Sequence, residues 1–130
     1  MFWPQLWRHN TIKRRFDMLK EDCLFCKIIE GKIPSTKVYE DDKMLVFKDI
    51  EPKAKVHLLA VPKDHFKLLA DMNASQAELL KYMLEKIPSI AAENGCEKGF
   101  RLVINQGEDA GQSVFHLHIH ILGGQTLPWE

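Results

Sequence analysis

The stretch His116-Leu117-His118-Ile119-His120-Ile121-Leu122-Gly123-Gly124 carries the strongest signal in this chain. It holds three of the six histidines, and single aliphatic residues separate them. Because successive side chains of a β-strand point to opposite faces, a strand here places the three imidazoles on one face and the aliphatic side chains on the other. Imidazoles titrate near neutral pH, attack electrophiles and bind metals. The stretch therefore predicts a strand that carries a functional site.

The composition of the chain is that of one compact domain. It has 130 residues, of which 45% are hydrophobic, and this is enough to form a core. The formal net charge is zero, so we expect neither a nucleic acid nor a membrane surface as a partner. An odd number of cysteines, three, argues against a secreted disulfide framework. We therefore expect a cytoplasmic protein.

The first seventeen residues differ from the rest of the chain. They contain bulky apolar side chains followed by a basic run, and their net charge is +3. No helix cap or turn signal organises them. We expect residues 1–17 to be an N-terminal extension outside the fold, with Met18 as a candidate first residue of the natural protein. Residues 18–130 are expected to form the domain.

One long helix is predicted in the middle of the chain. Ser75 and Glu78 have the spacing of a capping box at its start. Pro88 is expected to kink or divide it, because proline removes a backbone hydrogen bond. Asn94-Gly95 is expected to end it.

The other elements complete an α+β pattern. A short helix capped by Asp22 is expected to run through Ile29. Five strands are predicted, at residues 37–40, 44–48, 56–61, 101–105 and 115–122. This order predicts a five-stranded antiparallel sheet with one long and one or two short helices on one side.

The histidine row has three interpretations at this point. The histidines can be structural, they can bind a metal such as zinc, or one imidazole can act as a nucleophile that its neighbours orient. The preceding segment, from Asn105 to Ser113, holds two glycines, an amide and a hydroxyl. It is either a plain polar loop or one that turns its N–H groups toward a phosphate. A phosphate beside an imidazole nucleophile indicates phosphoryl or nucleotidyl transfer.

These residues resemble the histidine-triad superfamily of nucleotide hydrolases and transferases. The row follows the superfamily's pattern of three histidines that alternate with hydrophobic residues. Further segments are similar to its Hint branch: Leu24-Phe25-Cys26-Lys27-Ile28-Ile29, Ile33-Pro34, Tyr39-Glu40-Asp41-Asp42, Phe47-Lys48-Asp49-Ile50, His57-Leu58-Leu59-Ala60-Val61-Pro62-Lys63 and Gly111-Gln112-Ser113-Val114-Phe115-His116. The resemblance runs from about Cys23 to Gly124, so it covers the whole predicted domain.

The resemblance implies an activity and the residues that perform it. The activity would be hydrolysis of purine nucleoside 5′-phosphoramidates or similar nucleotidyl conjugates, with no cofactor for catalysis. His118 would be the nucleophile that forms a nucleotidyl-imidazole intermediate, His120 and Ser113 would hold the phosphate and the leaving group, and His116 completes the triad. Further nucleotide-binding positions would be Phe25, Ile28, Phe47, Asp49, Ile50, Asn105, Gly111 and Gln112.

Cys23 and Cys26 form a second informative pair. Their spacing suits a zinc site, a redox dithiol or two buried thiols without a metal. No parallel βαβ pattern surrounds them, and this weakens the redox interpretation. The resemblance to bacterial members of the family implies a structural zinc, with His57 and His116 as the other two ligands.

The sequence is compatible with two other functions, and the resemblance implies an oligomeric state. A dinucleoside polyphosphate hydrolase is one alternative, because Gln112 precedes His116 by four positions as in that branch of the family. A non-catalytic, nucleotide-binding regulatory protein is the other. The resemblance also implies a homodimer that pairs through residues 75–94 and 101–105.

Overall fold

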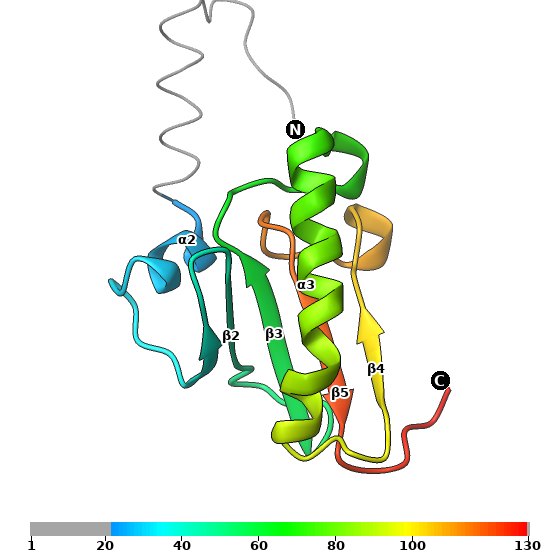
Figure 1. Cartoon of the computed structure of the whole chain (residues 1–130). Helices are drawn as coiled ribbons and strands as arrows, with labels where there is room; N and C mark the ends of the chain where they lie inside the picture. The colour runs from blue at the N-terminus through cyan, green and yellow to red at the C-terminus, as the bar shows by residue number, and fades with distance from the viewer. Residues whose placement is uncertain (1–21, 130) are drawn as a thin grey trace, which may run out of the picture.

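The computed structural model describes residues 22–129 (Figure 1). The expected extension at residues 1–17 and the domain boundary at residue 18 lie outside the described residues. The strands are β1 (Lys37–Glu40), β2 (Met44–Lys48), β3 (Val56–Pro62), β4 (Phe100–Val103) and β5 (Ile119–Gly123). The helices are α2 (Leu24–Ile29) and α3 (Ala74–Glu93), and single 3₁₀ turns form η1 (Leu69–Asp71) and η2 (Glu108–Ala110).

The five strands form one antiparallel sheet in the order β1-β2-β3-β5-β4. The central strand β3 is buried at six of its seven positions, so both of its faces are covered. The edge strands β1 and β4 are at most half-buried. This arrangement confirms the predicted α+β class and the antiparallel sheet.

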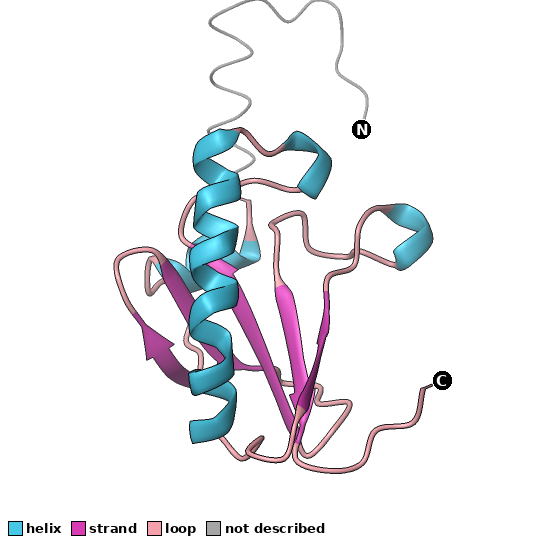
Figure 2. Cartoon of the chain, turned by 45° about the vertical axis from the view of Figure 1, so that its right-hand side comes forward, coloured by secondary structure: helices cyan, strands magenta, loops and turns pink. Residues whose placement is uncertain are grey.

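The two faces of the sheet carry different cores. Against one face, α3 packs Met83, Ile87, Ile90 and Ala91 onto apolar side chains of β2, β3 and β5 (Figures 1 and 2). The opposite face is covered in part by α2. The side chains of that second core are Cys23, Phe25, Cys26, Ile28, Leu45, Phe47, Leu59 and Val61. The short helix therefore lies across the sheet from α3, and the prediction that the helices share one side is wrong for α2.

The long helix begins earlier than predicted and continues through its proline. Asn73 is the cap, and it forms a reciprocal capping box with Gln76 instead of the predicted Ser75 and Glu78. Pro88 lies inside the helix and does not divide it. Because proline has no N–H, the carbonyl of Leu84, four residues earlier, receives no helical hydrogen bond from Pro88. Leu84 is 42% exposed, so this turn of the helix faces solvent. Burial of the other side of α3 keeps the helix in one piece.

Other element boundaries also differ from the predictions. The cap of α2 is Cys23 rather than Asp22, and its Sγ lies 3.4 Å from the N–H of Cys26. Strand β4 ends at Val103, two residues early. Strand β5 begins at Ile119 rather than residue 115, because the N–H of Leu117 donates to the carbonyl of Phe66 at 2.7 Å, outside the sheet ladder.

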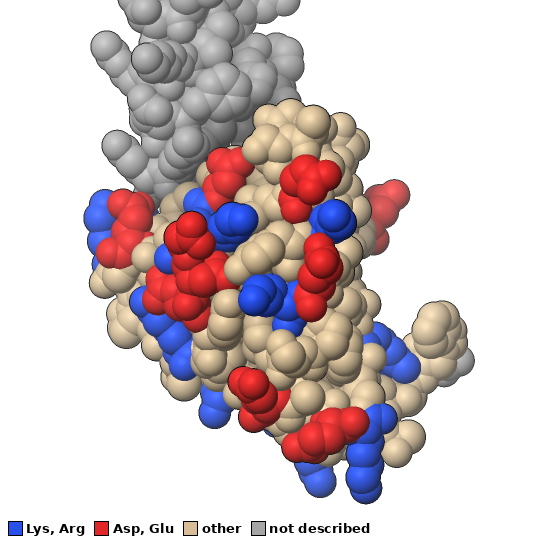
Figure 3. All heavy atoms as spheres, in the orientation of Figure 1, with Lys and Arg blue, Asp and Glu red and all other residues tan. Residues whose placement is uncertain are grey.

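No helix within residues 22–129 is both long and apolar enough to cross a membrane. On the face of the molecule seen in Figure 3, acidic and basic side chains alternate over α3 and the neighbouring turns. This face therefore presents no continuous surface of one charge.

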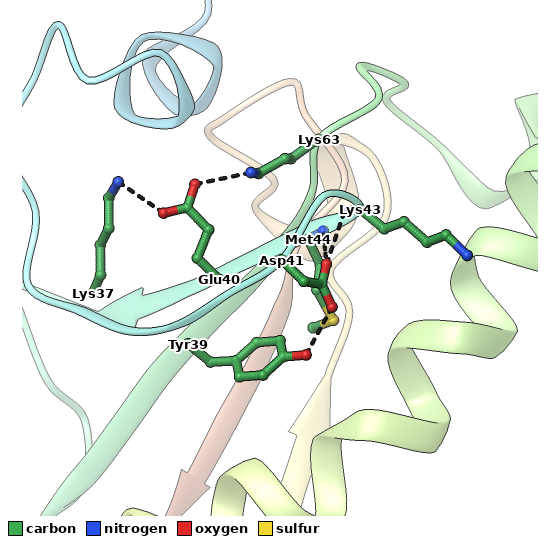
Figure 4. Close-up of polar contacts among 7 residues, drawn as sticks. All are labelled: Lys37, Tyr39, Glu40, Asp41, Lys43, Met44 and Lys63. Carbon is green, nitrogen blue, oxygen red and sulfur yellow. Dashed lines mark hydrogen bonds and ion pairs between the residues drawn. The ribbon is translucent and has the colours of Figure 1, made fainter.

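Asp41 joins the hairpin of β1 and β2 to the long helix. Its Oδ1 accepts the N–H groups of Lys43 and Met44 at 2.8 and 2.9 Å, which closes the turn (Figure 4). Its Oδ2 accepts the hydroxyl of Tyr39 at 2.8 Å and a short hydrogen bond from Tyr82 on α3. Burial raises the pKa of Asp41, but these hydrogen bonds outweigh it and lower the pKa to about 2. The hairpin and α3 are thus joined through one ionised carboxylate.

We expect Asp41→Asn to lower the free energy of unfolding by about 1–3 kcal/mol at pH 7, because an amide nitrogen cannot accept the two tyrosine hydroxyls. The pKa of Asp41 lies below its ordinary value of 3.8, so its contribution is present above pH 4 and is lost as the pH falls toward 2. Urea titrations from pH 7 to pH 3 measure the difference. The exposed neighbour provides the control, Asp42→Asn, which we expect to change stability by less than about 0.5 kcal/mol. Equal effects of the two substitutions would contradict this role for Asp41.

Candidate functional site

The histidines of the predicted row lie on the sheet face opposite α3. In the pairing of β3 with β5, Leu59 faces His120 and His57 faces Leu122, so His57 and His120 are diagonal neighbours on one face. His118 continues this row just before β5, with its ring centroid 5.1 Å from that of His120. Of the three histidines of the row, only His120 belongs to a strand. The imidazoles of His118 and His120 are nevertheless adjacent, as predicted.

A first cluster combines two cysteines with two histidines. Cys23 and Cys26 come from the start of α2, His65 follows β3, and His116 precedes β5. The distances between sulfur and Nδ1 atoms are 3.4, 3.3 and 3.6 Å, and the two Nδ1 atoms are 3.1 Å apart. With zinc–sulfur bonds of about 2.3 Å and zinc–nitrogen bonds of about 2.0 Å, a tetrahedron separates S from N by about 3.5 Å and N from N by about 3.3 Å. The four side chains therefore fit a tetrahedral zinc ion.

The tautomer of His116 also suits a metal ligand. This side chain is fully buried, and its Nε2 lies 2.8 Å from the carbonyl oxygen of Pro62. A carbonyl can only accept, so Nε2 carries the proton and the lone pair of Nδ1 points at the two sulfurs. Burial lowers the pKa of His116 to about 4, which keeps the ring neutral.

The structure corrects the prediction that His57 is the fourth metal ligand. The backbone N–H of Lys53 donates to Nδ1 of His57 at 3.0 Å, so the proton of the neutral ring is on Nε2. That Nε2 lies 3.3 Å from Oδ2 of Asp49 and 2.9 Å from Nδ1 of His120, in a cluster separate from the cysteines. His57 is thus a hydrogen-bond donor to these two groups, and His65 lies beside the cysteines at the place predicted for His57.

His65 was the residue that sequence reasoning missed as a candidate ligand. It stands three residues after the end of β3, whereas His57 stands near the start of that strand. Because α2 covers the sheet next to the end of β3, only a histidine at that end can reach Cys23 and Cys26. The direction of β3, taken together with the position of α2, would have distinguished His65 from His57.

His118 presents an unprotonated nitrogen to the site. Its Nδ1 lies 2.8 Å from the carbonyl oxygen of His116, so Nδ1 carries the proton and Nε2 carries the lone pair. Burial lowers the pKa of His118, and it also lowers the pKa of His57 and brings that of His120 to about 4. These imidazoles are therefore neutral near pH 7. A neutral imidazole with a fixed tautomer is suited to attack an electrophile.

The loop before the histidines is organised from within by Gln112. Its side chain, 7% exposed, accepts the N–H of Gly107 at 2.9 Å and donates to the carbonyls of Lys67 and Val114 at 3.2 and 3.3 Å. Gln106, which the sequence analysis did not single out, accepts the N–H of Leu69 at 2.6 Å. The two amides therefore tie this loop to the segment that precedes α3.

Other predicted phosphate contacts lie along the same loop. Asn105 is half-buried, while Gly111 is exposed and ends η2 with a φ of 74°. Such a positive φ favours glycine. Ser113 is exposed between the loop and the histidine segment. These residues belong to the segment that precedes His116, and their contact with a phosphate stays a prediction.

The predicted base pocket is brought together only in part. Phe25, Ile28 and Phe47 lie in the same buried core, with the two phenyl rings 5.7 Å apart. Asp49 is half-buried next to His57, and its Oδ1 accepts the N–H of Glu51 at 2.8 Å. Ile50, in contrast, is 94% exposed and joins neither core.

Comparison with known proteins decides the family. The family model described as "Scavenger mRNA decapping enzyme C-term binding" matches residues 22–128. An uncharacterised HIT-like protein of Synechococcus elongatus is 46% identical over 111 residues, which cover 85% of this chain and 97% of that protein. The chain belongs to the histidine-triad superfamily. The resemblance that the sequence showed is thereby confirmed.

Other similar proteins include a hydrolase of known structure and two proteins whose names mention zinc. A HIT family hydrolase of Legionella pneumophila superposes with a TM-score of 0.78 at 46% identity, covering 83% of this chain and 97% of that one. The 14 kDa zinc-binding protein of Zea mays is 45% identical over 82% of this chain and 84% of its own length. A Zn-bound histidine triad family protein of Mycobacterium smegmatis has a TM-score of 0.70 at 32% identity, over 82% of this chain and 77% of that one.

We expect His65→Ala to lower the zinc content of the purified protein well below one equivalent, because a zinc ion loses one of its four ligands. His57→Ala is the matched control and should retain zinc close to the wild-type level, since its Nε2 is a donor. Inductively coupled plasma mass spectrometry on protein purified without chelator or metal resin measures both. Loss of zinc from His57→Ala alone would restore the ligand set predicted from the sequence.

Proposed function

We propose that this protein hydrolyses purine nucleoside 5′-phosphoramidates or similar nucleotidyl conjugates, with His118 as the nucleophile. The observation that supports it best is the hydrogen bond from Nδ1 of His118 to the carbonyl of His116, which leaves the Nε2 lone pair for attack. In the first step Nε2 bonds to the α-phosphorus, the phosphorus–nitrogen bond of the substrate breaks and the amine leaves with a proton. Water then displaces the imidazole, which releases the nucleoside monophosphate. Two displacements replace one difficult step.

The neighbouring His120 is a candidate donor of the proton that the leaving group requires. Nε2 of His57 carries its proton and lies 2.9 Å from Nδ1 of His120, so His120 accepts there and carries its own proton on Nε2. His120 is next to His118 in the row, with a half-buried side chain. A donor at this place can protonate the departing amine or bind a phosphate oxygen. Asp49, 3.3 Å from His57, favours the charge that forms on these rings.

We also propose that Cys23, Cys26, His65 and His116 hold a structural zinc ion. Such an ion would join α2, the segment after β3 and the segment before β5. All four ligand positions are then taken by protein atoms, as in structural rather than catalytic zinc sites. The hydrolytic chemistry is left to the imidazoles.

We expect His118→Ala to lower turnover of an adenosine 5′-phosphoramidate by at least about 10³-fold, because the variant cannot form the covalent intermediate. Adenosine monophosphate should still bind with an affinity within a few-fold of wild type. Phosphorus NMR of the products and calorimetric titration measure the two quantities, and mass spectrometry of quenched wild type should show a nucleotidyl adduct. Near-normal turnover by the variant would remove His118 from this role.

The same assay separates the alternative functions. Wild type should cleave the phosphoramidate with a higher kcat/KM than a diadenosine polyphosphate. A reversed order would favour the dinucleoside polyphosphate hydrolase. Binding of adenosine monophosphate without adduct or turnover on either substrate would favour a non-catalytic nucleotide-binding protein.

We propose further that the protein is a homodimer that pairs through α3 and the edge strand β4. Among residues 22–129, no strand pairs with the outer edge of β4, and Leu84 on α3 is 42% exposed. An unpaired strand edge is a ready site for pairing with a second chain.

Light scattering should give a mass twice the 15.1 kDa of the chain. Leu84→Glu should shift the protein toward the monomer, because it places a charge in an apolar contact. Leu24→Glu is the control, since Leu24 is 43% exposed but lies on α2, on the other face of the sheet. A monomeric wild type, or equal effects of the two variants, would refute this interface.

A further inference from the structure

Phe25 lies between the Cys/His cluster and the proposed nucleophile. It stands between Cys23 and Cys26 in the sequence, and its side chain is only 4% exposed. Its ring meets that of His118 nearly at a right angle, with centroids 5.0 Å apart, and that of His116 with centroids 6.0 Å apart. Both contacts are edge-to-face arrangements, which aromatic pairs prefer. One phenyl ring thus touches both a candidate metal ligand and the nucleophile.

The backbone that carries His118 is held by the same cluster. The N–H of Leu117 donates to the carbonyl of Phe66, the residue after His65, at 2.7 Å. Nδ1 of His118 lies 2.8 Å from the carbonyl of His116. His65 and His116 are both members of the Cys/His cluster, so each segment that supplies a ligand also contacts the segment that carries the nucleophile.

The sheet does not provide this support. Strand β5 begins at Ile119, so residues 116–118 lack the ladder hydrogen bonds that hold His120. The ring of His118 is therefore oriented by one hydrogen bond to its own chain and by two ring contacts, with Phe25 on one hand and with His120 of the same segment on the other. A side chain with so few polar constraints depends on its packing neighbour for a single rotamer.

We propose that Phe25 is a positioning residue that holds His118 in the orientation for attack, and that the Cys/His cluster keeps Phe25 in place. This inference rests on the proposed function. It differs from the base-pocket role that the family resemblance implies for Phe25, because it acts on His118 before any nucleotide binds. The lone pairs of two sulfurs and two nitrogens converge in the cluster, so a bound cation stabilises it. Metal content and the orientation of His118 are then coupled.

The test compares Phe25→Leu with wild type by kinetics and by ¹⁵N NMR of the histidine rings. A misplaced nucleophile should lower kcat by about 10- to 100-fold, with KM changed less than about twofold. In nucleotide-free protein, the ring signals of His118 should change from one Nδ1–H tautomer to a mixture. Leu45→Val, which trims the same core without adding or removing a ring, should leave the tautomer as in wild type. If Phe25→Leu does not fold, Phe25→Met fills the site without a ring and is measured in the same way.

A second arm tests the link to the cluster. His65→Ala removes a member of the cluster and keeps the phenyl group of Phe25. If the cluster holds Phe25 in place, the His118 signals of this variant should match those of Phe25→Leu. Removal of zinc from wild type by a chelator, and its return, should shift the His118 signals reversibly. A raised KM with unchanged kcat and tautomer in Phe25→Leu would make Phe25 a base-pocket residue and overturn the proposal. Unchanged His118 signals in both His65→Ala and chelated protein would overturn the coupling. If wild type turns over no substrate, the proposed function fails, while the NMR arm still decides whether Phe25 orients His118.

Discussion

At the end of β3, the carbonyl oxygen of Pro62 accepts a hydrogen bond from Nε2 of the fully buried His116, and both the Cys/His cluster and His118 depend on it. The bond turns the Nδ1 lone pair of His116 toward Cys23 and Cys26. It also fixes the backbone of His116, whose carbonyl accepts the proton of His118. One residue therefore orients a ligand of the proposed metal site and fixes the tautomer of the proposed nucleophile next to it. A buried polar pair of this kind is costly to break, because either group alone would be left unsatisfied.

The histidines of the two clusters differ in the groups that their ring nitrogens meet. His116 donates a hydrogen bond from Nε2 to a carbonyl and has an unprotonated Nδ1, whereas His57 accepts the N–H of Lys53 on Nδ1 and carries its proton on Nε2. The first arrangement is that of a metal ligand, and the second is that of a hydrogen-bond donor to His120. A single backbone contact to each ring thus separates a proposed structural role from a proposed catalytic one within one face of the sheet. The proposed role of Phe25 adds a path by which one cluster can affect the other.

Much of the fold could be predicted from local patterns. The hairpin strands β1 and β2 have the predicted bounds, because their side-chain alternation and the Asp41-Asp42 turn are encoded within a dozen residues. The predicted boundaries failed where distant contacts decide. β5 starts late because Leu117 bonds to Phe66, and α3 passes through Pro88 because its buried side packs on the sheet. The prediction of the sheet face on which α2 lies was also wrong, since the sequence pattern of a six-residue helix is too short to indicate which face it covers.

By itself, the sequence determined the family and the antiparallel sheet, and it singled out most of the candidate site residues, since these follow from residue type and short spacing. It placed His118 in a row with His116 and His120, and Cys23 beside Cys26. Only the tertiary structure decided which histidine completes the pair of cysteines and which nitrogen of each ring is free. The physical reason is that a tautomer depends on the backbone group that a ring meets. Pro62 and Lys53 meet these rings only once the chain has folded.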